Sequence, residues 1–374
     1  MRSIRSTIAA AFLLSGIIVI GNIVIAAQSP PDSRDMEIDS AARSAVIDAA
    51  LENINNSYVF PEVAKQMEKH VRALQKNGEY DSISSGREFA ARLTKDLQSI
   101  SKDKHLNLRF SYDPLPVRSR NDRPSEEEIE RRNRFMERVN YGFETVQRLE
   151  GNVGYIEFRG FFDAEAGAET VAAAMNFVAN TDALIFDLRR NGGGSPAMVA
   201  LICSYLFGEE KVHLNDLYWR EGDRTDEFWT MPEKVKAPHY VGKDVYVLTS
   251  GRTFSGAEEF SYNLKNLKRA TIVGETTGGG AHPGGVYRLT DHFNIFISTG
   301  RAISPITKTN WEGTGVIPDV PVAKELALET AYKMALEKSL AKAETESDKA
   351  ALKQLIHDTE MKLKKQEKAV ASSH

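Results

Sequence analysis

The chain has 374 residues, which is enough for two or three domains and for a sizeable buried core. Its composition is that of a globular protein. The net charge of −4 lacks the basic excess of nucleic-acid-binding proteins, so nucleic acid is not expected as a partner. The single cysteine, Cys203, excludes disulfides within the chain. Because it lies in an apolar helical pattern, we expect it to be a small buried residue.

The segment 1–27 has the pattern of an export signal. Arg2 and Arg5 precede an apolar run from Thr7 to Ala27 that ends in small residues. The run is 21 residues long, so retention as a membrane anchor remains an alternative to cleavage as a signal peptide. Both alternatives place the following residues outside the cytoplasm. The scarcity of cysteine favours a bacterial periplasm over a disulfide-stapled secreted domain.

Residues 38–110 are predicted to form a small N-terminal helical domain. Apolar residues recur at helical spacing in successive stretches, one of which opens at Pro61. Another follows Ser85, which has Glu88 three residues later and so forms a capping-box pattern. The alternating stretch 106–110 then predicts a strand, with His105 at its start.

The pattern changes after a charged linker and helix at residues 111–140. From 141 to 323, short apolar runs alternate with amphipathic stretches, which predicts an α/β domain with parallel strand pairings. Residues 324–374 are rich in charge and helical in pattern, and we expect a solvated C-terminal helical extension there.

Ser255 stands where a strand pattern passes through a turn into a helix. The β-branched run 245–248 precedes it, and Gly256 opens the helical pattern. Such a turn exposes a serine hydroxyl beside the unpaired N–H groups of a helix N-terminus, which suits a nucleophile. Ser255 followed by Glu258 also fits an ordinary capping box, and the local pattern alone leaves both interpretations open.

Two glycine-rich loops and one further motif complete the candidate site. The stretch DLRRNGGGSP at 187–196 follows a strand pattern and precedes a helix, so its backbone N–H groups can approach a ligand closely. It has no Gly-Lys-Ser/Thr ending, which argues against a nucleotide loop. The stretch GETTGGGAHPGG occupies 274–285, and WEGTGVIPDV occupies 311–320.

Together these motifs resemble the tail-specific (C-terminal processing) serine peptidases, serine peptidase family 41. The closer resemblance is to the branch that includes interphotoreceptor retinoid-binding protein and the tricorn core protease, and it covers about residues 38–340. It implies a ClpP/crotonase-like domain of ββα units behind an N-terminal helical bundle. It also implies cleavage of peptide bonds without a cofactor.

The sequence departs from the Ser–Lys members of that family. The position that holds their lysine is Gly280 in this chain. A serine hydroxyl without a base is a poor nucleophile at neutral pH. The tricorn-like arrangement supplies a histidine instead, and His105 in DKHL matches it. A serine that precedes the tricorn histidine is replaced by Lys104. The segment between His105 and Tyr141 is too short for a PDZ domain.

The resemblance therefore implies a role for each matching residue. Ser255 is the expected nucleophile and His105 the expected base. Glu312 matches a supporting glutamate of the tricorn-like arrangement. The N–H groups of Gly256 and Gly194 are expected to form the oxyanion hole.

Alternatives remain open at this stage. His282, in the second glycine-rich loop, is the rival base. No histidine pair has a metal-ligand spacing such as HExxH, so no metal and no cofactor are predicted. The leading hypothesis is an exported serine endopeptidase acting on peptides or unfolded protein segments. The main alternative is a non-catalytic carrier of retinoids or lipids with the same fold. A CoA-binding crotonase-like enzyme is a minor third hypothesis, since a shared fold does not fix function.

Overall fold

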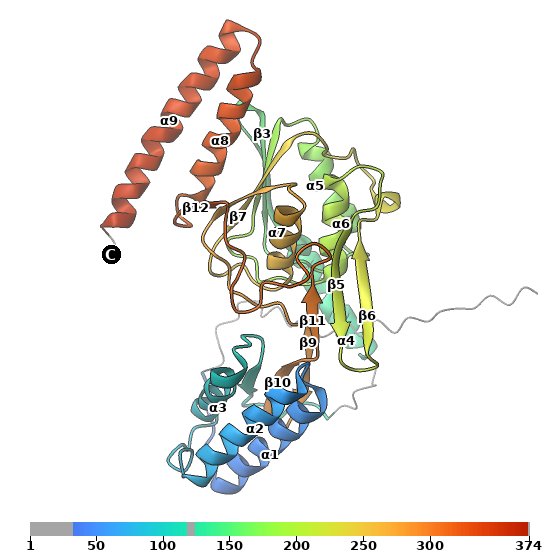
Figure 1. The fold of residues 1–374 in the computed structure, drawn as a ribbon, viewed down its shortest axis with the longest axis vertical. Helices are drawn as coiled ribbons and strands as arrows, with labels where there is room; N and C mark the ends of the chain where they lie inside the picture. Colours follow the sequence, from blue (N-terminus) through green and yellow to red (C-terminus); the bar gives the residue numbers. More distant parts are fainter. Residues whose placement is uncertain (1–32, 118–123, 373–374) are drawn as a thin grey trace, which may run out of the picture.

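A computed structural model describes residues 33–117 and 124–372, and the predicted export signal lies outside these ranges. A helical unit and an α/β unit are joined through a narrower region, and a helical hairpin projects from the far side of the α/β unit (Figure 1). Within the described ranges, no helix combines the length and the apolarity needed to cross a membrane.

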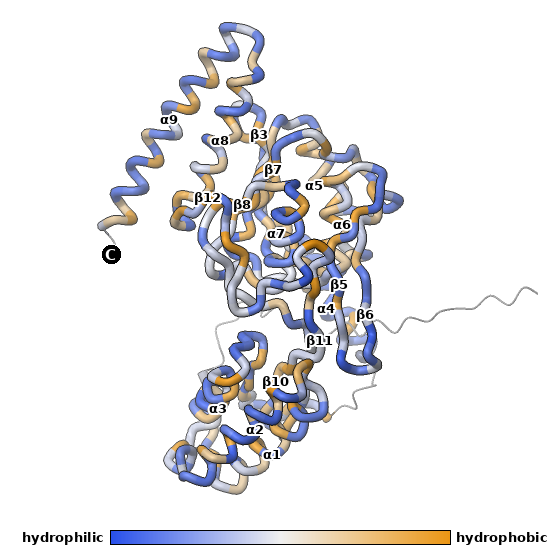
Figure 2. Tube along the Cα trace, viewed as in Figure 1, coloured by the Kyte–Doolittle hydropathy of each residue, from blue (hydrophilic) through white to orange (hydrophobic). Residues whose placement is uncertain are grey.

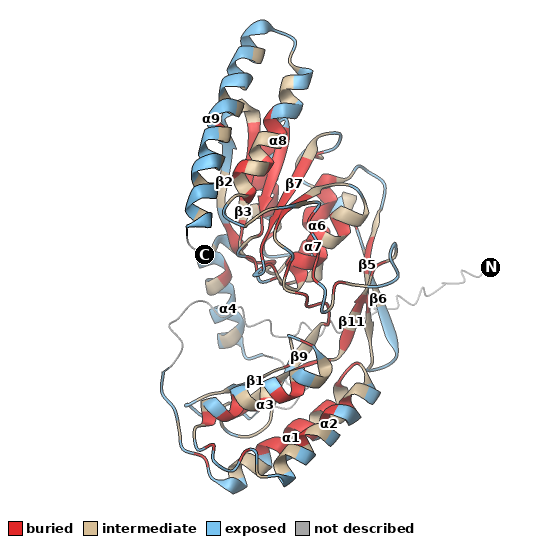
Figure 3. Cartoon of the chain, turned by 60° about the vertical axis from the view of Figure 1, so that its left-hand side comes forward, coloured by how far each residue is buried: buried red, intermediate tan, exposed pale blue. Residues whose placement is uncertain are grey.

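The helical unit forms where the sequence placed it, because each helix has a start signal and one apolar face. Asp39 accepts a hydrogen bond from the Ala42 N–H, Pro61 occupies a first turn, and Ser85 accepts from the Glu88 N–H. The buried faces of the helices point toward one another (Figure 3). These helices are α1 (Ser40–Ser57), α2 (Pro61–Lys76) and α3 (Gly86–Ser101).

Strands from two distant parts of the chain close this helical core. They form an antiparallel sheet in which the central strand contributes the buried residues Phe293, Ile295 and Ile297 to the helical core. The helical unit is therefore completed by residues that follow most of the α/β unit in sequence. The strands are β1 (Asn107–Phe110), β10 (Phe293–Ser298) and β9 (Gly284–Arg288).

The α/β unit is built on a mostly parallel sheet of order β12-β8-β7-β4-β3-β2, in which only the β2–β3 pair is antiparallel among the described strands. Its four central strands, β8, β7, β4 and β3, are short apolar runs buried on both faces, as is typical of parallel sheets. The strands are β2 (Phe143–Leu149), β3 (Val153–Phe158), β4 (Ala183–Asp187), β7 (Asp244–Thr249), β8 (Thr271–Gly274) and β12 (Val320–Pro321).

Helices cover both faces of this sheet. Alternate strand residues such as Phe186 and Val247 face one helical layer, while Ile185 and Leu248 face the C-terminal hairpin. Much of the last helix is hydrophilic (Figure 2), as the charged sequence predicts. The first layer is α5 (Ala168–Val178), α6 (Pro196–Leu206) and α7 (Gly256–Asn266), and the hairpin is α8 (Ala327–Lys342) and α9 (Glu346–Ala371).

The remaining described elements include a small antiparallel sheet that the sequence analysis did not predict. One of its strands reads RTDEFW, so its polar composition gave little strand signal. The charged helix expected in the 111–140 linker is present, with a Ser125–Glu128 capping box. These elements are β5 (His213–Trp219), β6 (Arg224–Trp229), β11 (Gly300–Ile303) and α4 (Glu126–Arg138).

The predicted class, an α/β domain behind an N-terminal helical region, is confirmed. Because β3, β4, β7 and β8 run parallel, their carboxyl ends lie at one edge of the sheet. Ligands of open parallel sheets bind outside this edge. The NGGG turn, Ser255 and the second glycine-rich loop all follow strands that end there.

Candidate active site

Ser255 has a backbone conformation unlike that of the other serine and threonine helix caps. Its φ is 54° and its ψ is −123°, whereas Ser85, Ser125 and Thr345 have φ values of −81°, −63° and −95°. A positive φ in a residue with a Cβ costs on the order of 1–3 kcal/mol and persists only where the surroundings impose it. Such strained strand-to-helix turns expose catalytic serines.

The surroundings that impose this conformation come from the β4–α6 loop. The Phe254 N–H donates to the Asn191 carbonyl at 3.1 Å, and the Thr253 hydroxyl donates to the Leu188 carbonyl at 2.8 Å. The Ser250 hydroxyl donates to the Arg189 carbonyl at 2.6 Å. The two loops are therefore tied together by the residues that immediately precede the serine.

The NGGG turn approaches Ser255 so closely that only glycine fits. At Gly193, where φ is 98°, a Cβ would lie 2.6 Å from the Gly256 nitrogen. At Gly256, a Cβ would lie 3.0 Å from the Gly194 nitrogen. Among the described residues, neither the Gly194 N–H nor the Gly256 N–H has a hydrogen-bond partner. Two free donors beside a serine hydroxyl are the geometry of an oxyanion hole.

Glu258 is a site residue whose role the sequence indicated only as a helix cap. Its buried carboxylate accepts from the Ser255 N–H at 2.9 Å, as the capping pattern predicts. It also accepts from the Thr277 hydroxyl at 2.5 Å and from the N–H groups of Gly279 and Gly280 at 2.6 and 2.8 Å. One carboxylate thus fixes the second glycine-rich loop against the turn that holds Ser255. Burial raises the pKa of Glu258, and these hydrogen bonds oppose that shift.

His105 lies beside the nucleophile turn. Its ring centroid is 4.5 Å from that of Phe254, the residue before Ser255, and it stacks on Phe296 at 5.6 Å. No hydrogen bond joins it to the Ser255 hydroxyl in the described structure. Catalytic hydrogen bonds in unliganded enzymes are often long and tighten when substrate binds.

Position 280, which holds the catalytic lysine in the Ser–Lys family members, has no room for a side chain in this chain. A Cβ at Gly280 would lie 2.7 Å from His105 Cε1 and closer still to the Phe254 ring. Lys104 turns away from His105, and its ammonium donates to the Gly278 carbonyl at 2.6 Å. The rings of Phe254 and His105 thus leave no room for a side chain at position 280, and Lys104 secures the neighbouring loop.

Glu312 joins the histidines rather than the serine. The Glu312 Oε2 atom accepts from the Ala281 N–H at 2.5 Å and lies 3.4 Å from His282 Nδ1. Asp103, which the sequence analysis did not single out, lies 3.9 Å from the same nitrogen. The Asp103 Oδ1 atom accepts from the His105 N–H at 2.9 Å, so this carboxylate shapes the turn that carries His105.

Burial shifts the titration of this cluster. It raises the pKa of Glu312 to about 7, while nearby His282 opposes the shift. Burial also lowers the pKa of His105 to about 4, against the attraction of Asp103. Burial would raise the pKa of Asp103, but the neighbouring His282, His105 and Ser298 side chains outweigh it and hold that pKa below its usual value. A neutral imidazole beside an ionised carboxylate has a lone pair available and a partner that stabilises its protonated form.

The structure therefore brings the predicted residues into two adjoining groups. Ser255, Gly256 and Gly194 form the first, and His105 contacts it through Phe254. His282 and Glu312 lie on the far side of His105, with Asp103. Asp103 and Glu258 were missed as site residues because their partners lie far away in sequence. The local signals were the capping-box position of Glu258 and, for Asp103, only a place two residues before His105.

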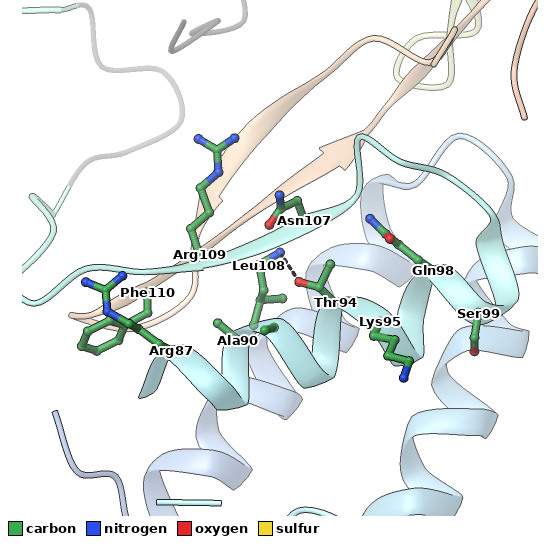
Figure 4. Close-up of a pocket in the computed structure, with 11 residues that line it drawn as sticks. Arg87, Ala90, Thr94, Lys95, Gln98, Ser99, Asn107, Leu108, Arg109 and Phe110 are labelled. Atoms are coloured by element: carbon green, nitrogen blue, oxygen red, sulfur yellow. Dashed lines mark hydrogen bonds between the residues drawn. The ribbon is translucent and has the colours of Figure 1, made fainter. Parts of the chain in front are cut away.

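A surface groove of about 860 Å³ lies elsewhere, between α3 and β1 (Figure 4). The Leu108 N–H donates to the Thr94 hydroxyl at 2.9 Å on its floor, and Arg87 and Arg109 stand at its rim. None of the residues that line this groove belongs to the Ser255 or His105 clusters.

Comparison with known proteins shows the family of the chain. A family model described as "Peptidase family S41" matches residues 152–322, and one described as the "N-terminal domain of Peptidase_S41 in eukaryotic IRBP" matches residues 40–146. Together the two models account for most of the chain. The chain belongs to peptidase family S41, and the predicted resemblance is confirmed.

Among curated proteins, the chain is 29% identical over 173 residues to the chloroplastic carboxyl-terminal-processing peptidase 2 of Arabidopsis thaliana. The match covers 46% of this chain and 32% of that protein, so the chain spans about a third of the relative it matches.

Two solved structures share the fold at low sequence identity. A candidate peptidase from Parabacteroides merdae has a TM-score of 0.57 at 20% identity, over 81% of this chain and 99% of that one. A lipoprotein from Streptococcus agalactiae has a TM-score of 0.51 at 15% identity, over 79% and 96%.

Proposed function

We propose that this member of family S41 is an exported serine endopeptidase in which Ser255 is the nucleophile and His105 is the base. The observation that carries the proposal is the positive φ of Ser255, imposed beside the unpartnered N–H groups of Gly194 and Gly256. A plain helix cap needs neither the strain nor the free donors.

The proposed reaction is acyl transfer to the serine followed by hydrolysis. The Ser255 oxygen attacks the peptide carbonyl carbon while His105 accepts the hydroxyl proton. The N–H groups of Gly194 and Gly256 donate to the developing oxyanion. When the C–N bond breaks, His105 returns the proton to the leaving amine. Water then attacks the ester with the same histidine as base, releasing the acid and restoring Ser255.

Supporting residues have separate proposed tasks. Asp103 would orient His105 and stabilise its protonated form. It would thereby replace the contact made by the serine that precedes the histidine in the tricorn-like arrangement, since Lys104 occupies that position here. Glu258 would keep the glycine-rich loop in place beside the nucleophile through its hydrogen bonds. Glu312 and His282 would help to hold His105 in place from the side of its ring away from Ser255, and would not contact the substrate.

Labelling with a fluorophosphonate probe tests the nucleophile. We expect stoichiometric labelling of the full chain that is lost in Ser255→Ala and retained in Ser261→Ala, a buried serine of the same helix. Labelling that persists in Ser255→Ala would refute the assignment, as would a folded wild-type protein that does not react.

Export and substrate class are also proposals. Residues 1–27 have the charge and apolar pattern of a signal, and unfolded or C-terminal peptide segments are the substrates that the family relationship suggests. N-terminal sequencing of protein recovered from the periplasm would decide between cleavage and anchoring. Recovery of uncleaved protein in the cytoplasmic fraction would contradict export.

Binding of a hydrophobic ligand is the second candidate. It is favoured by the groove between α3 and β1, whose floor includes Ala90, Leu108 and Phe110, in the segment matched by the IRBP-type domain. Saturable quenching or enhancement of retinol fluorescence that is lost in Ala90→Arg would support it. Such binding without fluorophosphonate labelling would favour a carrier over a peptidase.

A further inference from the structure

Four side chains that can ligate a metal meet at the junction of the helical and α/β units. Single ligand atoms of Asp103, His105 and Glu312 all lie within 4.8 Å of one another. His282 Nδ1 lies 3.4 Å from Glu312 Oε2 and 3.9 Å from Asp103 Oδ2. These residues come from the turn after α3, the loop before β9 and the loop after β11. Spacing along the sequence therefore gave no sign of the cluster.

Each of these side chains has a buried polar atom without a hydrogen-bond partner. The atoms are Asp103 Oδ2, His105 Nδ1, His282 Nδ1 and Glu312 Oε1. Asp103 is fully buried and His282 is 6% exposed. Buried polar atoms are satisfied in the great majority of native structures, and a group of unsatisfied ones indicates a missing water or ion. Two carboxylates can only accept when ionised, so a cation suits the cluster better than a hydrogen-bond donor shared among them.

We propose that this cluster is a zinc site, formed by Asp103, His105, His282 and Glu312, that regulates the peptidase by capturing His105. Imidazole and carboxylate ligands are the set that Zn²⁺ accepts in tetrahedral sites. Ligand atoms of tetrahedral zinc lie about 3.4 Å apart. The His282–Glu312 pair already has this separation at 3.4 Å, and the His282–Asp103 pair is wider at 3.9 Å. The ligand atoms of Asp103, His105 and Glu312 would close in from separations of up to 4.8 Å.

The contacts around the cluster orient the ligands. The Ala281 N–H holds Glu312 Oε2, and the Asp103 Oδ1 atom is fixed by the His105 N–H. The Phe60 ring packs edge-on against His282 at 5.3 Å. Such contacts preset a metal site and are worth about 10–100-fold in affinity. The Glu312 side chain is 15% exposed, which gives an ion a route from solvent.

The regulatory part of this inference rests on the proposed function. An imidazole that binds zinc through one nitrogen and carries hydrogen on the other has no lone pair left to accept a proton from Ser255. Zinc would also bridge Asp103 and His105 of the helical unit to His282 and Glu312 of the α/β unit. Bound metal would therefore hold the protein in an inactive, rigid state, and its removal would free the base.

Calorimetric titration of the metal-free full chain with Zn²⁺ tests the site directly, with Co²⁺ absorption as the second measurement. We expect one ion per chain and the intense visible bands of tetrahedral cobalt. We expect at least about 100-fold weaker binding in Asp103→Asn and in Glu312→Gln, because each loses a charged ligand while keeping its shape. Circular dichroism would establish that each variant is folded.

His213→Gln provides the matched control, since His213 Nε2 lies 2.7 Å from Asp216 Oδ1 in a histidine–carboxylate pair away from the site. We expect unchanged zinc affinity in this variant. Absence of stoichiometric zinc binding would overturn the inference. So would affinity that is lost in His213→Gln but retained in Glu312→Gln.

Fluorophosphonate labelling with and without zinc tests regulation separately. We expect zinc to block labelling of the wild type, and the zinc concentration needed to rise at least about 100-fold in Glu312→Gln. Labelling that continues at saturating zinc would overturn the regulatory role. A protein that is never labelled would refute the proposed peptidase, while the binding titration still decides the metal site.

Discussion

For the single residue Ser255, the positive backbone φ distinguishes a catalytic nucleophile from an ordinary helix cap. The motif TFSGAEE predicts either one, because a capping box and a nucleophile turn share the serine and the helix start. The sequence cannot show φ, which here follows from hydrogen bonds between the β4–α6 and β7–α7 loops. Asp103 is hidden for the same reason, since its partners lie about 180 and 210 residues downstream.

Replacing Ser255 by glycine should release strain that replacement by alanine retains. Both variants lose the hydroxyl, but only glycine adopts a φ of 54° without cost. Glycine also caps helices better than alanine, so the same pair of variants at Ser125, where φ is −63°, provides the control. We expect the glycine–alanine difference in the free energy of unfolding to be larger at Ser255 by at least about 1 kcal/mol. Urea unfolding measures it, and equal differences at both sites would contradict the strain.

Glu259 should make the protein less stable as pH rises. Burial raises its pKa to about 8, and the nearby Asn215 side chain opposes the shift. The folded state therefore keeps a proton that the unfolded chain loses above its ordinary pKa of 4.5, so stability is complete below that pH and declines toward pH 8.

Glu259→Gln should remove this decline. Its advantage over the wild type should grow by up to about 1.4 kcal/mol per pH unit across that range. Urea unfolding at several pH values is the measurement, and Glu210→Gln, at an exposed position, is the control. Parallel curves for Glu259→Gln and the wild type would show that Glu259 is ionised in the folded protein.

At the scale of elements, the second glycine-rich loop is a structural partner of α7. Ordering so much glycine costs conformational entropy, so the loop needs contacts that hold it in place. The structure gives the reason in contacts: Glu258 at the start of α7 binds the N–H groups of Gly279 and Gly280, and Lys104 binds the Gly278 carbonyl. The small sheet of β5, β6 and β11 was not predicted, because exposed polar strands depend on pairing more than on local pattern.

Gly280→Ala should disturb the base without touching the nucleophile. The added methyl group meets the rings of Phe254 and His105, so we expect a loss of about 1–3 kcal/mol in stability. The rate of fluorophosphonate labelling should fall by up to about 100-fold, since His105 is displaced. Gly285→Ala is the matched control, because nothing lies within 4 Å of its added Cβ. Equal labelling rates in the two variants would argue against His105 as the base.

At the scale of the whole molecule, the site is shared between two units. His105 and Asp103 belong to the turn after α3, while Ser255 and the glycine-rich loops belong to the α/β unit. The helical spacing of apolar residues sufficed to predict the bundle, and the alternation of strands and helices sufficed to predict the α/β class. The packing of β9 and β10 against the bundle was not predictable, since it depends on contacts across about 190 residues of chain.

Arg220 should help hold the two units together. Its guanidinium, just after β5, donates to the carbonyls of Asn55 and Tyr58 at the end of α1, at 3.0 and 2.8 Å. We expect Arg220→Ala to lower the free energy of unfolding by at most about 1.5–3 kcal/mol per lost hydrogen bond. It should also slow labelling of Ser255, because His105 becomes less well placed. Arg148→Ala, which loses a bond to Asn152 within the α/β unit, is the control. Unchanged labelling in Arg220→Ala would mean that this contact does not position the base.

The central claim is that His105, and neither a lysine nor His282, activates Ser255. The rate of fluorophosphonate labelling in the presence of a metal chelator, compared between His105→Gln and His282→Gln, tests it most directly. We expect a loss of about 10²–10⁴-fold in His105→Gln and a much smaller loss in His282→Gln, whose ring packs on Phe60. A folded His105→Gln protein that reacts at the wild-type rate, or a larger loss in His282→Gln, would contradict it.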